Sequence, residues 1–177
     1  MNRRTRRSIA IAACAGLLSL SGCALGGTRE GQESPAPQPK ATGLKDFDTC
    51  TVLSQEELAA AGVGGPGERV EHLSFEPGCS FEGDVRLLAL YKNQDQTVTS
   101  YATGGSWDSY DQIDINGRDA ARAVSSGSTD QGICNVLVNA GGGVVIVSVS
   151  GILRDDVPDP CGEAEKIARQ VEPRLPR

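Results

Sequence analysis

Apolar and polar residues alternate in short runs through much of the chain after residue 68. Because alternation places successive side chains on opposite faces of an extended backbone, each run predicts a half-buried strand. Turn residues separate the runs, and the pair Asn116 and Gly117 between two of them is typical of a tight hairpin. The pattern predicts strands at residues 69–75, 79–82, 85–91, 112–115, 120–125, 133–138 and 144–150.

Helices are predicted near both ends of this strand-rich region. Ser54 and Glu57 have the spacing of a capping box, and Gly62 is a suitable end for the short helix that follows them. After Cys161, apolar residues recur every three or four positions, which predicts a final helix. Residues 93–110 follow neither period. The apolar stripe of the final helix consists of Ala164, Ile167, Ala168, Val171 and Leu175.

The order of these elements predicts the fold class. Short strands joined by tight turns cannot pair in parallel, because parallel neighbours need a long crossover connection. An antiparallel sheet flanked by an N-terminal and a C-terminal helix is the simplest way to bury the apolar faces. We therefore expect a single α+β domain over residues 46–177.

The N-terminus has the pattern of an export signal. Arginines at positions 3, 4, 6 and 7 precede an apolar run over residues 9–20, and small residues follow. The run is shorter than the roughly 20 residues that a membrane-spanning helix needs. Residues 1–22 are therefore predicted to be a signal peptide. The adjacent Arg6 and Arg7 leave both general secretion and twin-arginine export open.

The sequence Leu20-Ser21-Gly22-Cys23 resembles the lipobox of bacterial lipoproteins. The resemblance implies that Cys23 receives a diacylglyceryl group and becomes the first residue of the mature chain. We expect the protein on the outer face of the cell membrane, held there by this lipid, since two or three acyl chains make anchoring stable.

Residues 23–45 are rich in proline, glycine and charge, with little apolar surface to bury. This composition predicts a flexible tether between the lipid and the domain. A recognition segment is the alternative.

Four cysteines remain once Cys14 leaves with the signal and Cys23 is lipidated. An even number in an oxidising compartment favours two disulfides, whereas a metal site would need closer cysteines or more histidines. Three pairings are possible. Cys161 extends the apolar stripe of the final helix, and Cys134 alternates with valines on one strand face, so helix-on-sheet packing favours Cys134–Cys161 and leaves Cys50–Cys79.

The charge of the chain narrows the range of partners. It has 17 basic and 23 acidic residues, a net charge of −6. Removing the leader takes away four arginines and no acid, which makes the mature chain more acidic still. Acidic surfaces are repelled by phosphate backbones, so we expect no nucleic-acid partner.

No catalytic, metal or cofactor site is predicted. His72 is the single histidine, and no G-x-S-x-G motif accompanies it, so a nucleophile with an activating base is not expected. Residues 111–117 faintly resemble a calcium loop, but position 112, where the first ligand should fall, is glutamine, and position 123, where the bidentate glutamate should fall, is alanine. The final helix is preceded by Asp155, Asp156 and Asp159. Their negative charges either stabilise the positive N-terminal end of this helix or form an acidic docking edge for a partner.

Tyr101, Trp107 and Tyr110 form the one aromatic cluster in a chain that is 4% aromatic. They lie where neither period is followed. Aromatic residues gathered in a loop commonly bind sugars, lipids or proteins. The cluster is therefore a candidate ligand or partner surface. Alternatively, the rings cover one face of the sheet.

Six local motifs follow one another along the domain: Cys50-Thr51-Val52-Leu53, Gly78-Cys79-Ser80-Phe81, Ile115-Asn116-Gly117-Arg118, Cys134-Asn135-Val136-Leu137-Val138, Pro160-Cys161-Gly162-Glu163-Ala164 and Leu175-Pro176. Taken together, and behind a lipobox, they resemble the actinobacterial lipoproteins of domain-of-unknown-function family 3558. The resemblance implies an extracytoplasmic domain with an antiparallel sheet and helices, similar to the photosystem-subunit and Mog1-type folds, and supplies no activity. It also leads us to expect tryptophan at position 81, where this chain has phenylalanine.

These features predict a monomeric, non-enzymatic binding or sensing module of the cell envelope, whose partner is a protein or an envelope component. A carrier or assembly factor for a small apolar or lipid ligand is the alternative.

Overall fold

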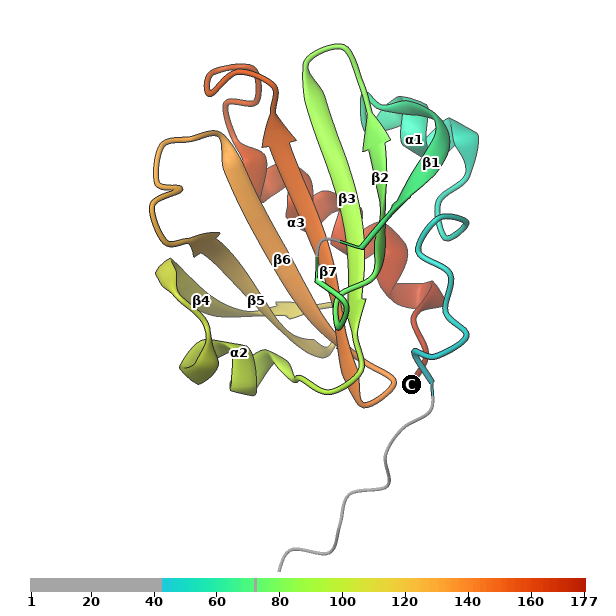
Figure 1. Ribbon diagram of the computed structural model, residues 1–177, viewed down its shortest axis with the longest axis vertical. Helices are drawn as coiled ribbons and strands as arrows, with labels where there is room; N and C mark the ends of the chain where they lie inside the picture. Colours follow the sequence, from blue (N-terminus) through green and yellow to red (C-terminus); the bar gives the residue numbers. More distant parts are fainter. Residues whose placement is uncertain (1–42, 72) are drawn as a thin grey trace, which may run out of the picture. The chain divides into compact units, whose positions relative to one another are not determined.

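The computed structural model describes residues 43–71 and 73–177, which form an antiparallel sheet with helices packed on it (Figure 1). The strands lie in the order β1-β2-β3-β7-β6-β5-β4. The strands are β1 (Gly64–Val70), β2 (Gly78–Glu82), β3 (Arg86–Asn93), β4 (Trp107–Ile115), β5 (Arg118–Ser125), β6 (Ile133–Ala140) and β7 (Gly143–Gly151). The helices are α1 (Gln55–Ala60), α2 (Val98–Gly104), α3 (Pro160–Val171) and the short 3-10 helix η1 (Glu172–Arg174). The predicted antiparallel sheet with helices is confirmed.

Two groups of hairpin-connected strands meet at the centre of the sheet. β1, β2 and β3 form one group, and β4 to β7 form the other. The last strand returns to pair with β3 along its full length, from Arg86 opposite Gly151 to Asn93 opposite Val144. This pairing joins the groups into one continuous sheet.

The main core lies between α3 and one face of the sheet. Figure 1 shows α3 crossing behind the central strands, and its packing partners are β6 and β7. The predicted stripe is buried, with Ala164, Ile167 and Val171 each at most 2% exposed. The strand residues that meet this stripe are Val136, Val138, Val145, Val147 and Val149.

Two disulfides connect α3 and the segment before α1 to strands of the sheet. Cys134 on β6 is bonded to Cys161 in the first turn of α3, and Cys50 is bonded to Cys79 on β2. These are the pairs that the sequence favoured. Cys79 and Cys134 are both fully buried.

The first strand lies earlier than predicted. We expected residues 69–75, but β1 spans Gly64–Val70, so the strand includes the residues Gly64, Gly65, Pro66 and Gly67, which are typical of turns. Pro66 is tolerated because β1 is an edge strand with an irregular register. Glycine is required at position 67, because a Cβ there would come within 2.3 Å of the Cys79 sulfur.

A short helix, α2, lies where no element was predicted. Thr97 caps it in a capping box with Ser100, and Val98 is its buried residue. With one buried position there is no apolar stripe to detect. β4 begins at Trp107, five residues before the predicted strand at Gln112.

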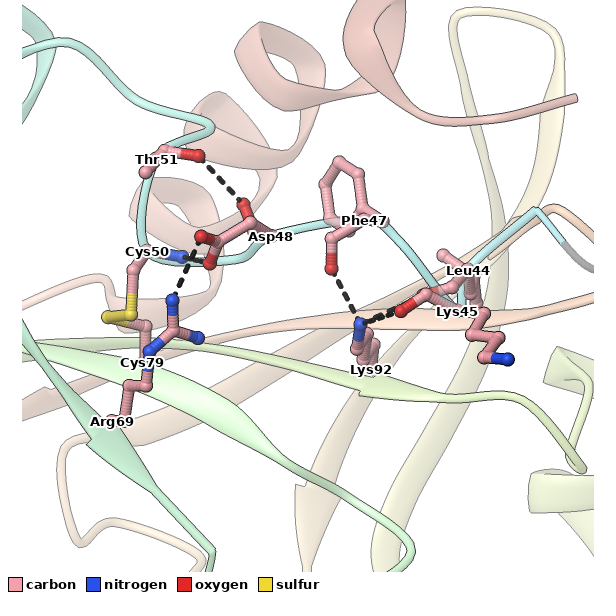
Figure 2. Close-up of polar contacts among 9 residues, drawn as sticks. All are labelled: Leu44, Lys45, Phe47, Asp48, Cys50, Thr51, Arg69, Cys79 and Lys92. Atoms are coloured by element: carbon pink, nitrogen blue, oxygen red, sulfur yellow. Dashed lines mark hydrogen bonds and ion pairs between the residues drawn. A yellow bond between two sulfur atoms is a disulfide. The ribbon is translucent and has the colours of Figure 1, made fainter.

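Residues 44–48 pack along β3 and take in the end of the predicted tether (Figure 2). Leu44 is fully buried. The Lys92 ammonium donates hydrogen bonds of 2.9, 2.9 and 2.7 Å to the backbone carbonyls of Leu44, Lys45 and Phe47. Asp48 accepts a hydrogen bond from the Arg69 guanidinium at 2.9 Å. The folded domain therefore begins before residue 46.

The cap of α1 predicts how stability depends on pH. The Arg174 guanidinium, and after it the backbone N–H of Ser54, hydrogen-bonds the Glu57 carboxylate and lowers its pKa from 4.5 to about 2. In the unfolded chain this carboxylate takes up a proton near pH 4.5, whereas in the folded protein it does so near pH 2. The stabilisation is therefore present above pH 4.5 and should be lost as the pH falls toward 2.

Urea unfolding at a series of pH values measures this effect. Glu57→Gln should reduce the loss of stability between pH 4.5 and 2. Glu56→Gln is the matched control, because Glu56 is exposed and forms no ion pair within the described residues. Equal slopes for both variants and the parent protein would contradict the assignment.

Candidate ligand-binding pocket

The sheet face opposite α3 carries a second, smaller apolar cluster. Its buried members on the strands are Ala121, Ala123, Leu137, Val144 and Ile146. The seven-residue helix α2 packs against β5 and β6 and contributes Val98 to the cluster. Because α2 is short, it covers one end of this face and leaves the neighbouring area open to a pocket.

The pocket has a volume of about 470 Å³, within the size range of small-molecule sites. Side chains of Tyr91, Leu137 and Ile146 from the central strands form its floor. Tyr101 and Trp107 line it from α2 and the start of β4. The connection between β1 and β2 contributes Leu73, Phe75 and Glu76.

The structure brings the three predicted aromatic residues together. The Trp107 ring lies 6.3 Å from that of Tyr101 and 5.4 Å from that of Tyr110, measured between centroids. Tyr101 and Trp107 line the pocket, whereas Tyr110 packs against Trp107 and does not. The rings thus cover part of the sheet face and also provide a wall of the pocket.

The polar atoms of these rings are used within the protein. Trp107 Nε1 donates to the Tyr101 carbonyl at 2.8 Å, and the Tyr110 hydroxyl donates to the Val98 carbonyl at 2.5 Å. Burial raises the pKa of Tyr110 to about 12. These bonds fix the rings, so a ligand would meet the ring of Trp107 rather than its N–H.

At one end of the pocket, hydrogen bonds from Tyr101 and Asn93 hold the carboxylate of Glu76 in place. The Tyr101 hydroxyl donates to Glu76 Oε1, and Asn93 Nδ2 lies 2.9 Å from the Tyr101 oxygen and 3.4 Å from the same Glu76 atom. Asn93 is 1% exposed, and its side-chain oxygen accepts from the backbone N–H of Asp95. Burial and, after it, the bond to Glu76 raise the pKa of Tyr101.

Sequence reasoning did not find Glu76, Asn93, Leu73 or Phe75 as site residues. Leu73 and Phe75 gave the alternation that predicted a strand over residues 69–75, yet they lie after β1 and are 46% and 54% exposed. Large apolar side chains exposed beside a pocket are typical of a binding surface. The sequence contains the signal of a binding surface, two large apolar residues, but their alternation predicted a strand instead.

A second group of exposed apolar side chains, the distal patch, lies at the other end of β3 and β7. It consists of Val85, Leu87, Ile152 and Leu153, which are between 37% and 68% exposed. The backbone N–H of Ile152 donates to the Val85 carbonyl at 3.0 Å, which brings the two ends of the patch together.

The carboxylates of Asp108 and Asp159 stabilise a turn and a helix end. Asp108 accepts hydrogen bonds from the backbone N–H groups of Gly127 and Thr129 and from the Thr129 hydroxyl, and the Thr129 hydroxyl bond is the largest contribution to its lowered pKa. Asp159 caps α3 through the N–H of Gly162. In the described part of the chain, no three His, Cys, Asp or Glu side chains are placed to hold a metal ion together.

Other predictions fall outside the described residues. They are the signal peptide at 1–22, the lipidation site Cys23, the tether up to residue 42, and His72. Within the described residues, no helix has both the length and the apolar character needed to cross a membrane.

Comparison with known proteins gives a family and no function. No curated protein and no solved structure matches the chain. A family model described as "protein of unknown function (DUF3558)" matches residues 10–174, nearly the whole sequence. The chain belongs to the DUF3558 family.

Proposed function

We propose that this protein is a lipid-anchored, extracytoplasmic binding module without enzymatic activity, which receives a ligand or a group of a partner in the pocket on the open sheet face. The observation that carries the proposal is the composition of that pocket. Ordered aromatic rings form one wall, exposed Leu73 and Phe75 form another, and polar side chains converge at one end. Such a combination of apolar walls and few fixed polar groups is typical of ligand sites.

The location on the outer face of the cell membrane is supported by the sequence. The leader over residues 1–22 and the lipobox ending at Cys23 have the order that lipoprotein export requires. Two disulfides in the folded domain fit an oxidising compartment. We further propose that the sheet with its N-terminal and C-terminal helices is of the Mog1 and photosystem-subunit type.

A carrier or assembly factor for a small apolar or lipid ligand is a second candidate. The apolar floor of Leu137 and Ile146 and the exposed side chains beside it favour this function. A carrier would retain lipid when the delipidated domain is purified, and native mass spectrometry would detect the added mass. A binding module that engages a protein would be recovered without it.

Capture of the partner in cells tests the proposal. The native lipoprotein is crosslinked in its own membrane and its neighbours are identified by mass spectrometry. Phe75→Ser should reduce recovery of the specific neighbour at least about tenfold, because truncation of an aromatic hot spot costs about 2 kcal/mol or more. Folding should be unaffected, since Phe75 is 54% exposed.

Leu153→Ser is the matched control. It removes a side chain that is also large, apolar and exposed, at 68%, but that belongs to the distal patch. Recovery that is unchanged by Phe75→Ser, or lost only with Leu153→Ser, would remove the pocket from the proposal and move the binding surface to the distal patch.

A further inference from the structure

The charge and ring content of the pocket indicates what kind of ligand it takes. Glu76 is the single charged side chain among the described residues that line it. Four of the other lining residues are aromatic: Phe75, Tyr91, Tyr101 and Trp107. We propose that the pocket binds an organic cation, an amine or a quaternary ammonium group with a small apolar body. This inference rests on the proposed binding function and adds the chemical class of the ligand.

Glu76 is positioned before any ligand arrives. Its Oε1 atom accepts hydrogen bonds from Tyr101 and from the buried Asn93. Within the described residues, Oε2 has no hydrogen-bond partner and Glu76 forms no ion pair. A carboxylate that is held by two donors can pair with a cation without further ordering of its side chain.

The aromatic rings supply the rest of the recognition. The face of an aromatic ring attracts a cation within about 6 Å, and rings around a quaternary ammonium group replace its weak hydration. The Trp107 N–H and the Tyr101 hydroxyl already donate within the protein, so these rings are fixed by their polar atoms. The pKa of Tyr91 is raised by burial and then by the charge of Glu76, in agreement with a negative potential at the pocket floor.

An anionic ligand fits this pocket poorly. No lysine or arginine is among its described lining residues, and the chain as a whole has a net charge of −6. Such a field attracts cations and repels anions. A neutral saccharide could stack on the same rings, but it carries no charge to pair with the Glu76 carboxylate.

The single tryptophan of the chain allows a direct test. Because Trp107 lines the pocket, its fluorescence reports occupancy without a label. The mature domain is titrated with choline and with neohexanol, the neutral analogue in which a tert-butyl group replaces the trimethylammonium group. A saturable change with choline, at a concentration at least about tenfold lower than with neohexanol, is expected because the charge contributes through both Glu76 and the rings.

Two variants assign the binding to these groups. Glu76→Gln keeps the size of the side chain and an acceptor for Tyr101, and it should weaken choline binding about tenfold, with neohexanol unaffected. Phe75→Leu keeps an exposed apolar side chain without the ring, and it should weaken choline binding about threefold. Since Phe75 is half exposed, this second variant decides the question if Glu76→Gln fails to fold.

The inference is overturned if choline gives no saturable change, if neohexanol binds as well as choline, or if N-acetylglucosamine oligomers bind and choline does not. In each of these cases Phe75-dependent capture of a partner in cells would still support the proposed binding function. If choline binds but crosslinking recovers no neighbour in a Phe75-dependent way, the pocket is a small-molecule site without a protein partner.

Discussion

Replacing Arg118 with methionine should lower the free energy of unfolding by about 3–5 kcal/mol, as is typical when one partner of a buried ion pair is removed. The Arg118 guanidinium pairs with Glu172 at 2.6 Å, and the two side chains are 12% and 8% exposed. Methionine would leave the Glu172 charge buried without its partner. It would also leave three backbone carbonyls without this donor, those of Asn139, Leu175 and Pro176. Urea unfolding of the purified domain measures the loss.

Arg122→Met is the control for this prediction. Arg122 also pairs with a glutamate of α3, Glu165, at 3.1 Å, but it is 41% exposed. Exposed pairs contribute about 1 kcal/mol or less, so this variant should unfold near the parent midpoint. A double variant, Arg118→Met with Glu172→Leu, should recover part of the loss because no buried charge remains. Equal losses for Arg118→Met and Arg122→Met would contradict the role of burial.

The hairpin turn before Arg118 could be predicted from the sequence. Asn116 and Gly117 have φ angles of +53° and +86°, the left-handed conformations that this residue pair adopts most readily. The turn sets the register in which Arg118 begins β5. It also lets Asn116 Nδ2 donate to the Arg169 carbonyl near the end of α3. A turn that two adjacent residues predict therefore fixes a contact between residues more than fifty positions apart.

The pairing of the cysteines could be predicted from apolar faces in the sequence, whereas the position of β1 could not. Cys134 and Cys161 each lie on an apolar face of a regular element, so the faces had to meet when the helix packed on the sheet. β1 has no such alternation, because its first four residues are three glycines and a proline in an edge strand of irregular register, and of these glycines only Gly67 is closely packed. α2 buries a single side chain, which leaves no period to recognise.

Only some of the residues that line the pocket could be predicted from the sequence. Tyr101 and Trp107 were found because aromatic residues are rare in this chain. Glu76 and Asn93 are 17 positions apart and meet only because β3 runs back along β2 toward the β1–β2 connection. Nothing local in the sequence marks a carboxylate held by a buried amide. Its place in the pocket becomes visible once the register of these strands is known.

Removing the disulfide between Cys134 and Cys161 should have an effect of similar size to that of Arg118→Met. The bond closes a loop between residues 27 positions apart, and the chain-entropy relation gives about 3–4 kcal/mol for a loop of this length. It also fixes the first turn of α3 to β6, at a position that is fully buried. The double variant Cys134→Ala with Cys161→Ala should therefore unfold at a clearly lower urea concentration than the parent.

The second disulfide separates chain entropy from native packing. Cys50 and Cys79 are 29 positions apart, so the entropy relation predicts nearly the same loss for the corresponding double alanine variant. Its native surroundings differ, because Lys92 and the pair of Arg69 with Asp48 hold the same N-terminal segment by other means. If the two losses agree within about 1 kcal/mol, restriction of the unfolded chain is the main effect. A much larger loss for the Cys134–Cys161 pair would instead show that this bond maintains the docking of α3 on the sheet.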